Sequence, residues 1–427
     1  MNTPRPSAPP AVRWITRTLQ DAGHDTWAVG GAVRDALMGR PSGDWDLTTQ
    51  ARPDQLQRLF RRTVPIGVEH GTVGVLARDG TMFEVTTFRK DVETDGRHAV
   101  VAFADRVEDD LARRDFTINA IAWHPLREEL LDPFQGIEDL EAGVLRTVGV
   151  AADRFAEDYL RVLRAFRFAG RFALQIEQET WSALCESVPH LPLLSGERIR
   201  EELLKVLSAD RKPSGALTLY AESGAMTVLY PELSQPSSSV ADADSWSDTL
   251  AGVDQLPPGR PFLRLAQLLW GVDPSSVASL LTRLRLSNAQ VDEIARRAEC
   301  AEMPSAEADD QAFRRWLSAT GRSRFAAVAR MGLARARARR HAGHRDTCDA
   351  VVAAWRRARA VLASGSALSV AELEFDGSDL IRMGLRPGPD FGRILDDLLD
   401  FVLVDPARNR ADVLESRVGA IVGSGDA

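Results

Sequence analysis

The most constraining feature of the sequence is the segment 30–47, GGAVRDALMGRPSGDWDL, in which two adjacent glycines are followed by two aspartates. The pattern predicts a strand, a tight turn, a helix, a loop and a second strand in immediate succession. We place the first strand at Thr26–Val29, the turn at Gly30-Gly31, the helix at Ala32–Met38 and the second strand at Asp44–Thr48. The N-terminal part of the chain is therefore expected to be an α/β domain.

Asp44 and Asp46 form a candidate metal site. In a strand, residues two apart point to the same face about 7 Å apart, so Trp45 and Leu47 are expected to pack on the other side. Carboxylate oxygens are the hard ligands that Mg²⁺ prefers, and Glu84 on a neighbouring predicted strand could complete a platform of three carboxylates. The alternatives are a solvated strand edge or a cap for the aspartates, and a solvent-facing side chain for Glu84.

The glycine pair is a candidate phosphate site. Gly30 and Gly31 allow backbone N–H groups to approach a phosphate closely, and the start of the following helix adds a favourable field. Arg34, one turn into that helix, could reach the same phosphate. A Gly-Gly pair is more often only a turn, so its combination with the two aspartates is what gives the segment its specificity.

The pattern changes from mixed to helical near residue 150. Before this point a helix is expected near 53–62, and Asp79-Gly80 predicts a hairpin between strands 72–77 and 82–89. After it we find no convincing strand, and a Ser/Asp-rich linker is expected at 234–248. Helices are expected at 152–172, 196–208, 262–283, 289–300, 311–340, 346–363 and 392–403.

The composition predicts a globular protein without a membrane span. The 427 residues are 44% hydrophobic and 27% charged, which excludes wholesale disorder. No apolar run approaches the roughly 18 residues that a span requires, and the N-terminus lacks the apolar centre of a signal peptide. Three isolated cysteines and no CxxC pair predict a reducing cytosol and exclude a cysteine zinc site.

Arginine supplies all but three of the 53 basic residues, although the formal net charge is -8. Codon bias explains most of this preference. However, residues 311–346 hold ten arginines and one acid, and such a stripe can bind a phosphate backbone despite the acidic total. The alternative is a solvated helix face. The candidate RNA contacts in this stripe are Arg335, Arg337, Arg339 and Arg340.

Residues 30–47 resemble the signature of the class II tRNA nucleotidyltransferases and bacterial poly(A) polymerases, members of the polymerase-β-like superfamily. Residues 113–120, RRDFTINA, resemble the next motif of that family, and residues 157–168 resemble its ED-x-x-R segment. Residues 195–207 are similar to the helix that closes the family's neck, and residues 375–399 to the C-terminal part of the bacterial enzymes. On these ordered motifs the sequence is identified as a member of this family.

The resemblance implies an α/β domain followed by an all-α remainder. The first is a polymerase-β-like nucleotidyltransferase head with a mixed sheet and helices, expected at residues 11–150. A helical neck with a nucleotide-selecting helix is expected at 151–210, a helical body at 211–300, and a helical tail that binds tRNA at 301–427.

The resemblance also implies a reaction in which an RNA 3′-hydroxyl attacks the α-phosphate of CTP or ATP and expels pyrophosphate, without a nucleic-acid template. Two Mg²⁺ ions, held by Asp44 and Asp46 and by Glu84 as a third ligand, would activate the hydroxyl and stabilise the leaving group. Asp115 is the candidate acceptor for the ribose 2′-hydroxyl, and Asn119 is equally a structural hydrogen-bonding residue. The nucleotide is expected among Gly30, Gly31, Arg34, Arg113, Arg114, Asp115, Asp158, Arg161, Arg164 and Arg167.

Asp158 and Arg161 are three residues apart in the predicted helix 152–172, so their side chains are expected to be neighbours on one face. An ordinary surface ion pair is the alternative. As a pair they present one acceptor edge and one donor edge, which match the amino group and ring nitrogen of cytosine and adenine. Uracil and guanine reverse this polarity, and a mismatch leaves buried polar groups unpaired.

Within the family, members add all of CCA, only CC, only A, or untemplated poly(A). The segment 90–107, whose family counterpart is linked to switching from C to A, contains Asp95-Gly96-Arg97 but is shorter than expected after His98. A partial adder, which would need a complementary enzyme in the same cell, therefore stays open beside full CCA addition, and poly(A) synthesis is third. A non-catalytic tRNA-binding protein and a transferase acting on a small molecule or protein are the remaining alternatives.

Overall fold

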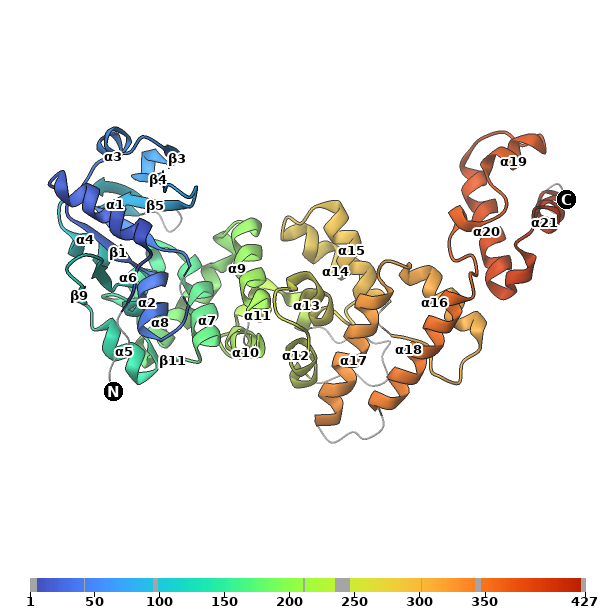
Figure 1. Cartoon of the computed structure of the whole chain (residues 1–427). Helices are drawn as coiled ribbons and strands as arrows, with labels where there is room; N and C mark the ends of the chain where they lie inside the picture. The colour runs from blue at the N-terminus through green and yellow to red at the C-terminus, as the bar shows by residue number, and fades with distance from the viewer. Residues whose placement is uncertain are drawn as a thin grey trace. The chain divides into compact units, whose positions relative to one another are not determined.

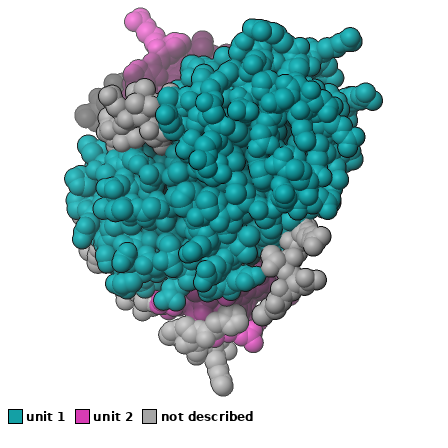
Figure 2. Space-filling model, turned by 90° about the vertical axis from the view of Figure 1, so that its left-hand side faces the viewer, with its two compact units in different colours: residues 1–206, 215–231 teal, residues 207–214, 232–427 magenta. Residues whose placement is uncertain are grey.

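The computed structural model describes residues 6–41, 43–94, 99–209, 212–234, 246–300, 302–341 and 347–423. The chain divides into two compact units, coloured teal and magenta in Figure 2. Unit 1 comprises residues 1–206 and 215–231, and unit 2 comprises residues 207–214 and 232–427. The division into head, neck, body and tail is finer than this and stays a prediction.

Unit 1 contains a seven-stranded mixed sheet in the order β3-β4-β5-β2-β1-β8-β9 (Figure 1). Neighbouring strands are antiparallel except for the parallel pair β2–β5. The expected α/β domain with a mixed sheet is therefore confirmed. The strands are β1 Thr26–Val29, β2 Asp46–Thr49, β3 Thr63–Gly67, β4 Thr72–Leu76, β5 Met82–Thr87, β8 Ala122–His124 and β9 Glu129–Leu131.

Helices bury both faces of this sheet. Side chains alternate across β1, so Ala28 packs in one core while Trp27 and Val29 pack in the other. The first core is closed by α1, α2 and α3, and the second by α4. These helices span α1 Pro10–Asp21, α2 Gly31–Leu37, α3 Pro53–Leu59 and α4 Val107–Ala112.

The strands near the glycine pair lie close to their expected positions. β1 has the predicted bounds, and the predicted hairpin forms at Gly80, which has a φ of 87° and donates to the carbonyl of Ala77 at 3.1 Å. The second strand begins at Asp46 rather than at Asp44, so Asp44 lies in the preceding loop. Strands β3, β8 and β9 have no counterpart in the sequence prediction, because they are short or largely exposed.

A second short sheet joins the end of the mixed region to the helices that follow. β10 Val144–Leu145 pairs in parallel with β11 Gln175–Ile176, so the expectation of no strand after residue 150 is wrong. Two residues are too few to show a strand periodicity. β6 Arg89–Thr94 and β7 Ala99–Phe103 form a separate pair, and residues 95–98 between them, including Asp95-Gly96-Arg97, lie outside the described residues. The remaining helices of unit 1 include α5 Gly136–Ala142, α6 Ala151–Glu157, α7 Leu160–Phe172, α8 Gln178–Ser187, α9 Gly196–Ser208, α10 Ser214–Glu222 and α11 Ala225–Leu229.

α7 and α10 pack closely at a pair of glycines. A Cβ built on Gly170 would lie 2.6 Å from the backbone nitrogen of Ala216, whereas one on Gly215 would lie 3.7 Å from the Cα of Gly170. The rings of Phe166 on α7 and Tyr220 on α10 are 4.6 Å apart between centroids. Residues 215–231 therefore belong with unit 1, although the chain enters unit 2 just before them.

Unit 2 is helical in its described residues, as expected. The predicted helix 262–283 is two helices separated at Gly271, and the predicted helix 311–340 is two helices separated at Gly321, because each glycine has a positive φ. Most of the predicted linker 234–248 lies outside the described residues. The helices are α12 Trp246–Asp254, α13 Pro261–Leu268, α14 Pro274–Arg283, α15 Asn288–Glu299, α16 Asp310–Thr320, α17 Phe325–His341, α18 Thr347–Ala363, α19 Gly377–Arg382, α20 Pro389–Val404 and α21 Ala411–Gly423. In the described part of the chain, no helix has the length and apolar character needed to span a membrane.

Candidate active site

The turn between β1 and α2 lies next to the first residue of β2. Val29, the last residue of β1, pairs with Asp46, and Gly30 follows it with a φ of 73° as the residue before α2. A Cβ on Gly30 would lie 3.0 Å from Nη1 of Arg114, so both the backbone angle and this close approach favour glycine. The structure thus brings Gly30, Asp46 and Arg114 together.

Asp46 lies on the face that the alternation predicted, whereas Asp44 lies in the loop before β2. Trp45 and Leu47 are buried in one core, while Asp44 and Asp46 are exposed. Leu47 pairs with Val85 in the parallel neighbour β5, so Asp46 and Glu84 each precede a paired core residue and project from the same face of the sheet.

Negative charge accumulates at Asp46. Its pKa is raised to about 6, first because neighbouring protein atoms displace part of the water around this still accessible carboxylate, then by the charge of Glu84, and further by Asp44, while Arg114 opposes these effects. A divalent cation relieves this kind of repulsion, and carboxylate oxygens suit a hard cation such as Mg²⁺. Among the described residues, however, no group of three His, Cys, Asp or Glu side chains is close enough to hold a metal ion. The structure therefore does not bring Glu84 close enough to act as a third ligand, and metal binding by Asp44 and Asp46 stays a prediction.

Arg114 combines two protein contacts with an unsatisfied donor. Its Nη2 donates to Asp110 at 3.2 Å and its Nη1 donates to the carbonyl of Asn119 at 3.3 Å. Its Nε is buried and has no hydrogen-bond partner in the described residues. An unpaired buried N–H is costly, so this atom is suited to an incoming acceptor such as a phosphate oxygen.

Asp115 is held by the protein itself. It is buried, and it accepts hydrogen bonds from the backbone N–H of Phe116 and from Nδ2 of Asn119, both at 2.9 Å. Nε of Arg164 donates to its other oxygen at 2.7 Å. Burial alone raises the pKa of Asp115, but the charge of Arg164 and these hydrogen bonds lower it overall. In this structure the carboxylate orders the protein, and its role as acceptor for a ribose hydroxyl stays a prediction.

Arg34, like Asp115, is held by contacts within the protein. It is buried on α2, donates to Asp35 through Nε at 2.9 Å, and donates to Asn119 through Nη1 at 2.5 Å. Its guanidinium lies 4.4 Å from the ring centroid of Phe172. Burial lowers the pKa of Arg34, and the charge of Asp35 opposes this shift. Arg34 therefore joins α2 to the segment around Asn119, and phosphate binding by it stays a prediction.

The predicted helix 152–172 is broken, which corrects the expected arrangement of Asp158 and Arg161. α6 ends at Glu157, α7 begins at Leu160, and Asp158 between them is extended with φ and ψ of -158° and 104°. Asp158 accepts from the backbone N–H of Leu160 at 3.0 Å through Oδ1, because aspartate readily caps a helix start. The two side chains are therefore not neighbours on one continuous helix face, and each has other partners.

Arg161 is anchored by residues on both sides of the break. Its Nη1 donates to Glu157 at 2.5 Å and to the carbonyl of Arg154 at 3.1 Å, and its Nη2 donates to the carbonyl of Arg113 at 3.2 Å. These contacts link α7 to the motif at residues 113–120. Arg113 thus lies beside Arg161, and a nucleotide site shared by the two stays a prediction.

Arg164 and Arg167 continue along α7 around the ring of Phe168. The charge of Asp115 raises the pKa of Arg164, and Arg167 donates to Glu202 on α9 at 2.6 Å. The guanidinium carbons of Arg34, Arg164 and Arg167 lie 5.2, 5.2 and 4.2 Å from the centroid of Phe168. The described contacts of Arg164 and Arg167 are thus structural, and direct nucleotide contact by either stays a prediction.

Sequence reasoning missed the residue that holds Asp158. Nη2 of Arg198 on α9 donates to Oδ2 of Asp158 at 2.7 Å. The sequence pattern identifies the segment that contains Arg198 only as a neck helix. An ion pair over 40 positions leaves no local signal in the sequence.

Several arginines of the stripe at residues 311–346 in unit 2 make contacts within the protein. Arg314 donates to the carbonyl of Leu403, Arg322 and Arg324 pair with acids elsewhere in unit 2, and Arg335 lies 4.4 Å from the ring centroid of Trp270. Of the four candidate RNA contacts, Arg337 and Arg340 are exposed, whereas Arg335 and Arg339 are half-buried. The stripe is therefore less uniform than its sequence indicates.

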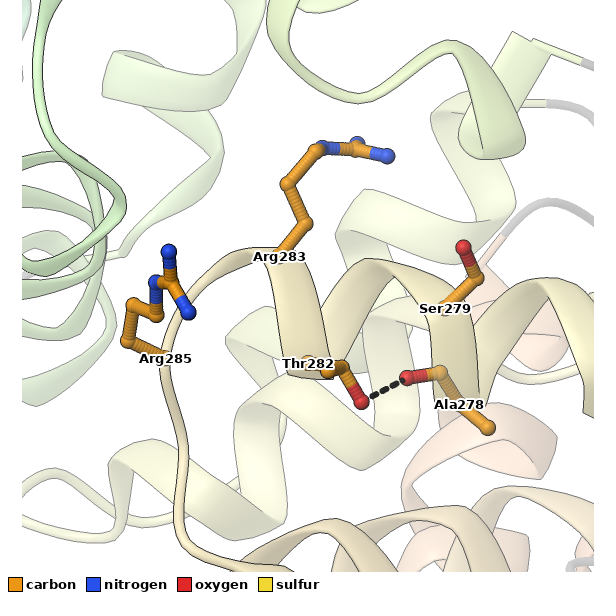
Figure 3. A pocket seen from close by; sticks show the side chains of 5 residues that line it. All are labelled: Ala278, Ser279, Thr282, Arg283 and Arg285. Atoms are coloured by element: carbon orange, nitrogen blue, oxygen red, sulfur yellow. Dashed lines mark hydrogen bonds between the residues drawn. The ribbon is translucent and has the colours of Figure 1, made fainter.

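A shallow groove in unit 2 lies at the end of α14 (Figure 3). It is lined by Ala278, Ser279, Thr282, Arg283 and Arg285. Thr282 donates to the carbonyl of Ala278 at 2.8 Å, and Arg283 pairs with Glu232 at 2.6 Å. None of the residues expected to bind nucleotide or metal lines this groove.

The mixed sheet, the glycine turn beside paired aspartates and the arginine-rich helix define a polymerase-β-like nucleotidyltransferase head, and comparisons with known proteins agree. Residues 26–146 match the family model of the poly A polymerase head domain. Residues 173–235 match the model of the probable RNA and SrmB-binding site of polymerase A.

Curated relatives match half of the chain. A CCA-adding enzyme of Geobacillus kaustophilus is 43% identical over 217 residues, which are 50% of this chain and 53% of that protein. One of Streptococcus gordonii is 46% identical over 197 residues, which are 46% of this chain and 49% of that protein. The chain thus spans about half the length of the curated relatives it matches.

Solved structures match almost all of the chain. The crystal structure of the Bacillus stearothermophilus CCA-adding enzyme in complex with CTP is 30% identical, with a TM-score of 0.72, over 98% of this chain and 100% of that one. The Thermotoga maritima CCA-adding enzyme complexed with tRNA shares the fold, with a TM-score of 0.55 at 21% identity over 97% of this chain and 96% of that one. The chain belongs to the class II CCA-adding enzyme family, whose members are nucleotidyltransferases, a generally metal-dependent class.

Proposed function

We propose that this protein adds all or part of the 3′-terminal CCA sequence to tRNA, using CTP and ATP and no nucleic-acid template. The observation that carries the proposal is the position of Asp46, beside the Gly30 turn and the charge of Glu84. The similarity to a CCA-adding enzyme bound to CTP over nearly the whole chain supports the same activity.

Different residues of unit 1 bind the metal ion and the triphosphate in this proposal. Asp44 and Asp46 would hold a divalent cation such as Mg²⁺, which would supply positive charge to activate the 3′-hydroxyl and to stabilise pyrophosphate. The N–H groups at the start of α2 and the unpaired Nε of Arg114 bind the triphosphate. The new bond joins the 3′-oxygen to the α-phosphorus, and the bond between the α- and β-phosphates breaks.

Asp158 and Arg161 select the base. The hydrogen bonds of Arg161 to Glu157, Arg154 and Arg113 use both N–H groups of Nη1 and one of Nη2, which leaves Nε and the second N–H of Nη2. Either donor can serve the ring nitrogen of the base. The carboxylate of Asp158 supplies the acceptor for the amino group of cytosine or adenine.

The exposed arginines of α17 bind the RNA backbone. Arg337 and Arg340 lie three residues apart on one helix face, so both can contact neighbouring phosphates. Arg335 and Arg339 contribute less in this proposal, because both are half-buried. A cytosolic location and a complementary partial-adding enzyme stay predictions.

The test supplies radiolabelled CTP or ATP, singly and together, with tRNA transcripts ending at the discriminator base, after one C, and after CC. Addition of both C residues and A identifies a full CCA enzyme. Arrest at CC, or use of the CC-ended transcript alone, identifies a partial adder. Long A tracts identify a poly(A) polymerase, and no incorporation with intact tRNA binding supports the non-catalytic alternative.

A further inference from the structure

Asp158 depends on another helix for the orientation of its carboxylate. It lies at the break between α6 and α7 with an extended backbone, so no regular helix surrounds it. Its Oδ1 accepts from the N–H of Leu160 at 3.0 Å, and its Oδ2 accepts from Nη2 of Arg198 at 2.7 Å. The last torsion of an aspartate side chain is broad, so one contact on each oxygen is needed to fix the carboxylate plane.

Arg161 does not share this dependence. Its guanidinium is held by Glu157 and by the carbonyls of Arg154 and Arg113, and Arg154 in turn pairs with Glu157 at 3.0 Å. The donor edge of the selecting pair is therefore fixed by α6, α7 and the segment at residue 113. The described side-chain contact that fixes the Asp158 carboxylate, which is the acceptor of the pair, comes from Arg198 on α9.

The Arg198–Asp158 pair is also accessible to a base. The side chains of Arg198 and Asp158 are 30% and 26% exposed, so they are neither sealed in a core nor free in solvent. Each carboxylate oxygen keeps a second lone pair beside its hydrogen bond to Leu160 or Arg198. Asp158 can therefore accept a base amino group while Arg198 still holds it.

We propose that Arg198 is a positioning residue for base selection, which holds the Asp158 carboxylate so that its remaining lone pairs face the amino group of cytosine or adenine. This inference rests on the proposed function, because it assigns a role within that reaction. Without Arg198 the carboxylate rotates about its last torsion, the amino group loses a fixed acceptor, and the penalty against uracil falls.

The test compares kcat and KM for CTP and UTP on a tRNA transcript ending at the discriminator base. Arg198→Ala lowers the CTP-to-UTP ratio of kcat/KM by about ten- to a hundredfold, the value of one hydrogen bond to a charged group. The effect falls mainly on KM for CTP. Arg198→Lys, which retains the charge, restores most of the ratio, and Arg58→Ala, an exposed ion-paired arginine on α3, leaves the ratio unchanged.

A double-mutant cycle separates positioning from a structural role. If Arg198 acts through Asp158, adding Arg198→Ala to Asp158→Ala changes the ratio no further. Arg198→Met keeps the aliphatic stem and replaces the alanine variant if that one fails to fold. An unchanged ratio in a folded Arg198→Ala or Arg198→Met variant, or additive effects in the cycle, overturns this inference. Absence of CTP and ATP incorporation by the wild-type protein overturns instead the proposed function.

Discussion

Arg164 on α7 donates through Nε to the buried carboxylate of Asp115, 49 positions earlier in the chain, at 2.7 Å. Three residues further along α7, Arg167 donates to Glu202 on α9 at 2.6 Å. These two pairs connect the helix that carries Arg161 to the RRD segment on one side and to the neck helix on the other. Both carboxylates are nearly inaccessible to solvent, so their charge state affects the stability of unit 1.

Unit 1 should lose stability in acid because of these pairs. Burial raises the pKa of Asp115 and of Glu202, but the charges of Arg164 and Arg167 and the associated hydrogen bonds lower both pKa values overall. A lowered pKa stabilises the fold fully above the unfolded values of about 3.9 and 4.3, and this contribution disappears as the pH falls through the folded pKa.

Urea denaturation between pH 7 and pH 3 checks this acid effect. A variant with Asp115→Asn and Glu202→Gln should be less stable at pH 7 by about 3 kcal/mol or more, because two half-buried arginines lose their buried charged partners. Its stability should then decline less between pH 5 and pH 3 than that of the wild type. Equal declines in the two proteins would show that other carboxylates control acid unfolding.

Asp44→Ala and Asp46→Ala should each reduce nucleotide incorporation by at least about a hundredfold, because the charge that stabilises the leaving group is removed. Binding of tRNA should persist, since the proposed RNA contacts lie in unit 2. Asp54→Ala, an exposed aspartate on α3 paired with Arg58, is the matched control. Incorporation that survives both active-site substitutions would reject the metal assignment.

The two glycines between α7 and α10 should respond oppositely to the same substitution. Gly170→Ala places a Cβ 2.6 Å from the backbone of Ala216 and should cost about 1–3 kcal/mol of unfolding free energy through overpacking. Gly215→Ala meets an ordinary van der Waals neighbour at 3.7 Å and should be neutral or stabilising by up to about 1 kcal/mol through helix propensity. Thermal unfolding of both variants measures the difference, and similar destabilisation at the two sites would contradict it.

Two arginines of α17 that are two residues apart should have different roles. Arg337→Ala should weaken tRNA binding and reduce the slope of log affinity against log salt by about 1, as expected when one phosphate is no longer neutralised. Arg335→Ala should instead lower stability, because it removes the guanidinium from the face of Trp270. Filter binding at several salt concentrations, with Arg393→Ala as an exposed control on α20, measures the first effect. A salt slope that Arg337→Ala leaves unchanged would exclude this residue from the RNA interface.

The sequence predicted β1, the hairpin at Gly80 and the opposite faces of Trp45 and Asp46 well, because each depends on residues close in the chain. It failed at Asp158, where a helical periodicity of apolar residues continues across a break. The signal for that break was present, since aspartate prefers caps to helix interiors. It could not predict Arg198 on Asp158 or Asn119 beneath Arg34, because those partners are brought together by packing between distant segments.

Residues 215–231 belong to unit 1, although residues 207–214 before them belong to unit 2. This order limits the positions at which the protein can be fused to a relative in a hybrid. α10 packs on α7 through Gly170, yet it follows a segment, 207–214, that belongs to unit 2. A hybrid that joins unit 1 to the helical remainder of a relative therefore needs its junction after Pro231. A junction at residue 206 would remove α10, the helix that packs against α7, and the transplanted unit would lack part of its own core.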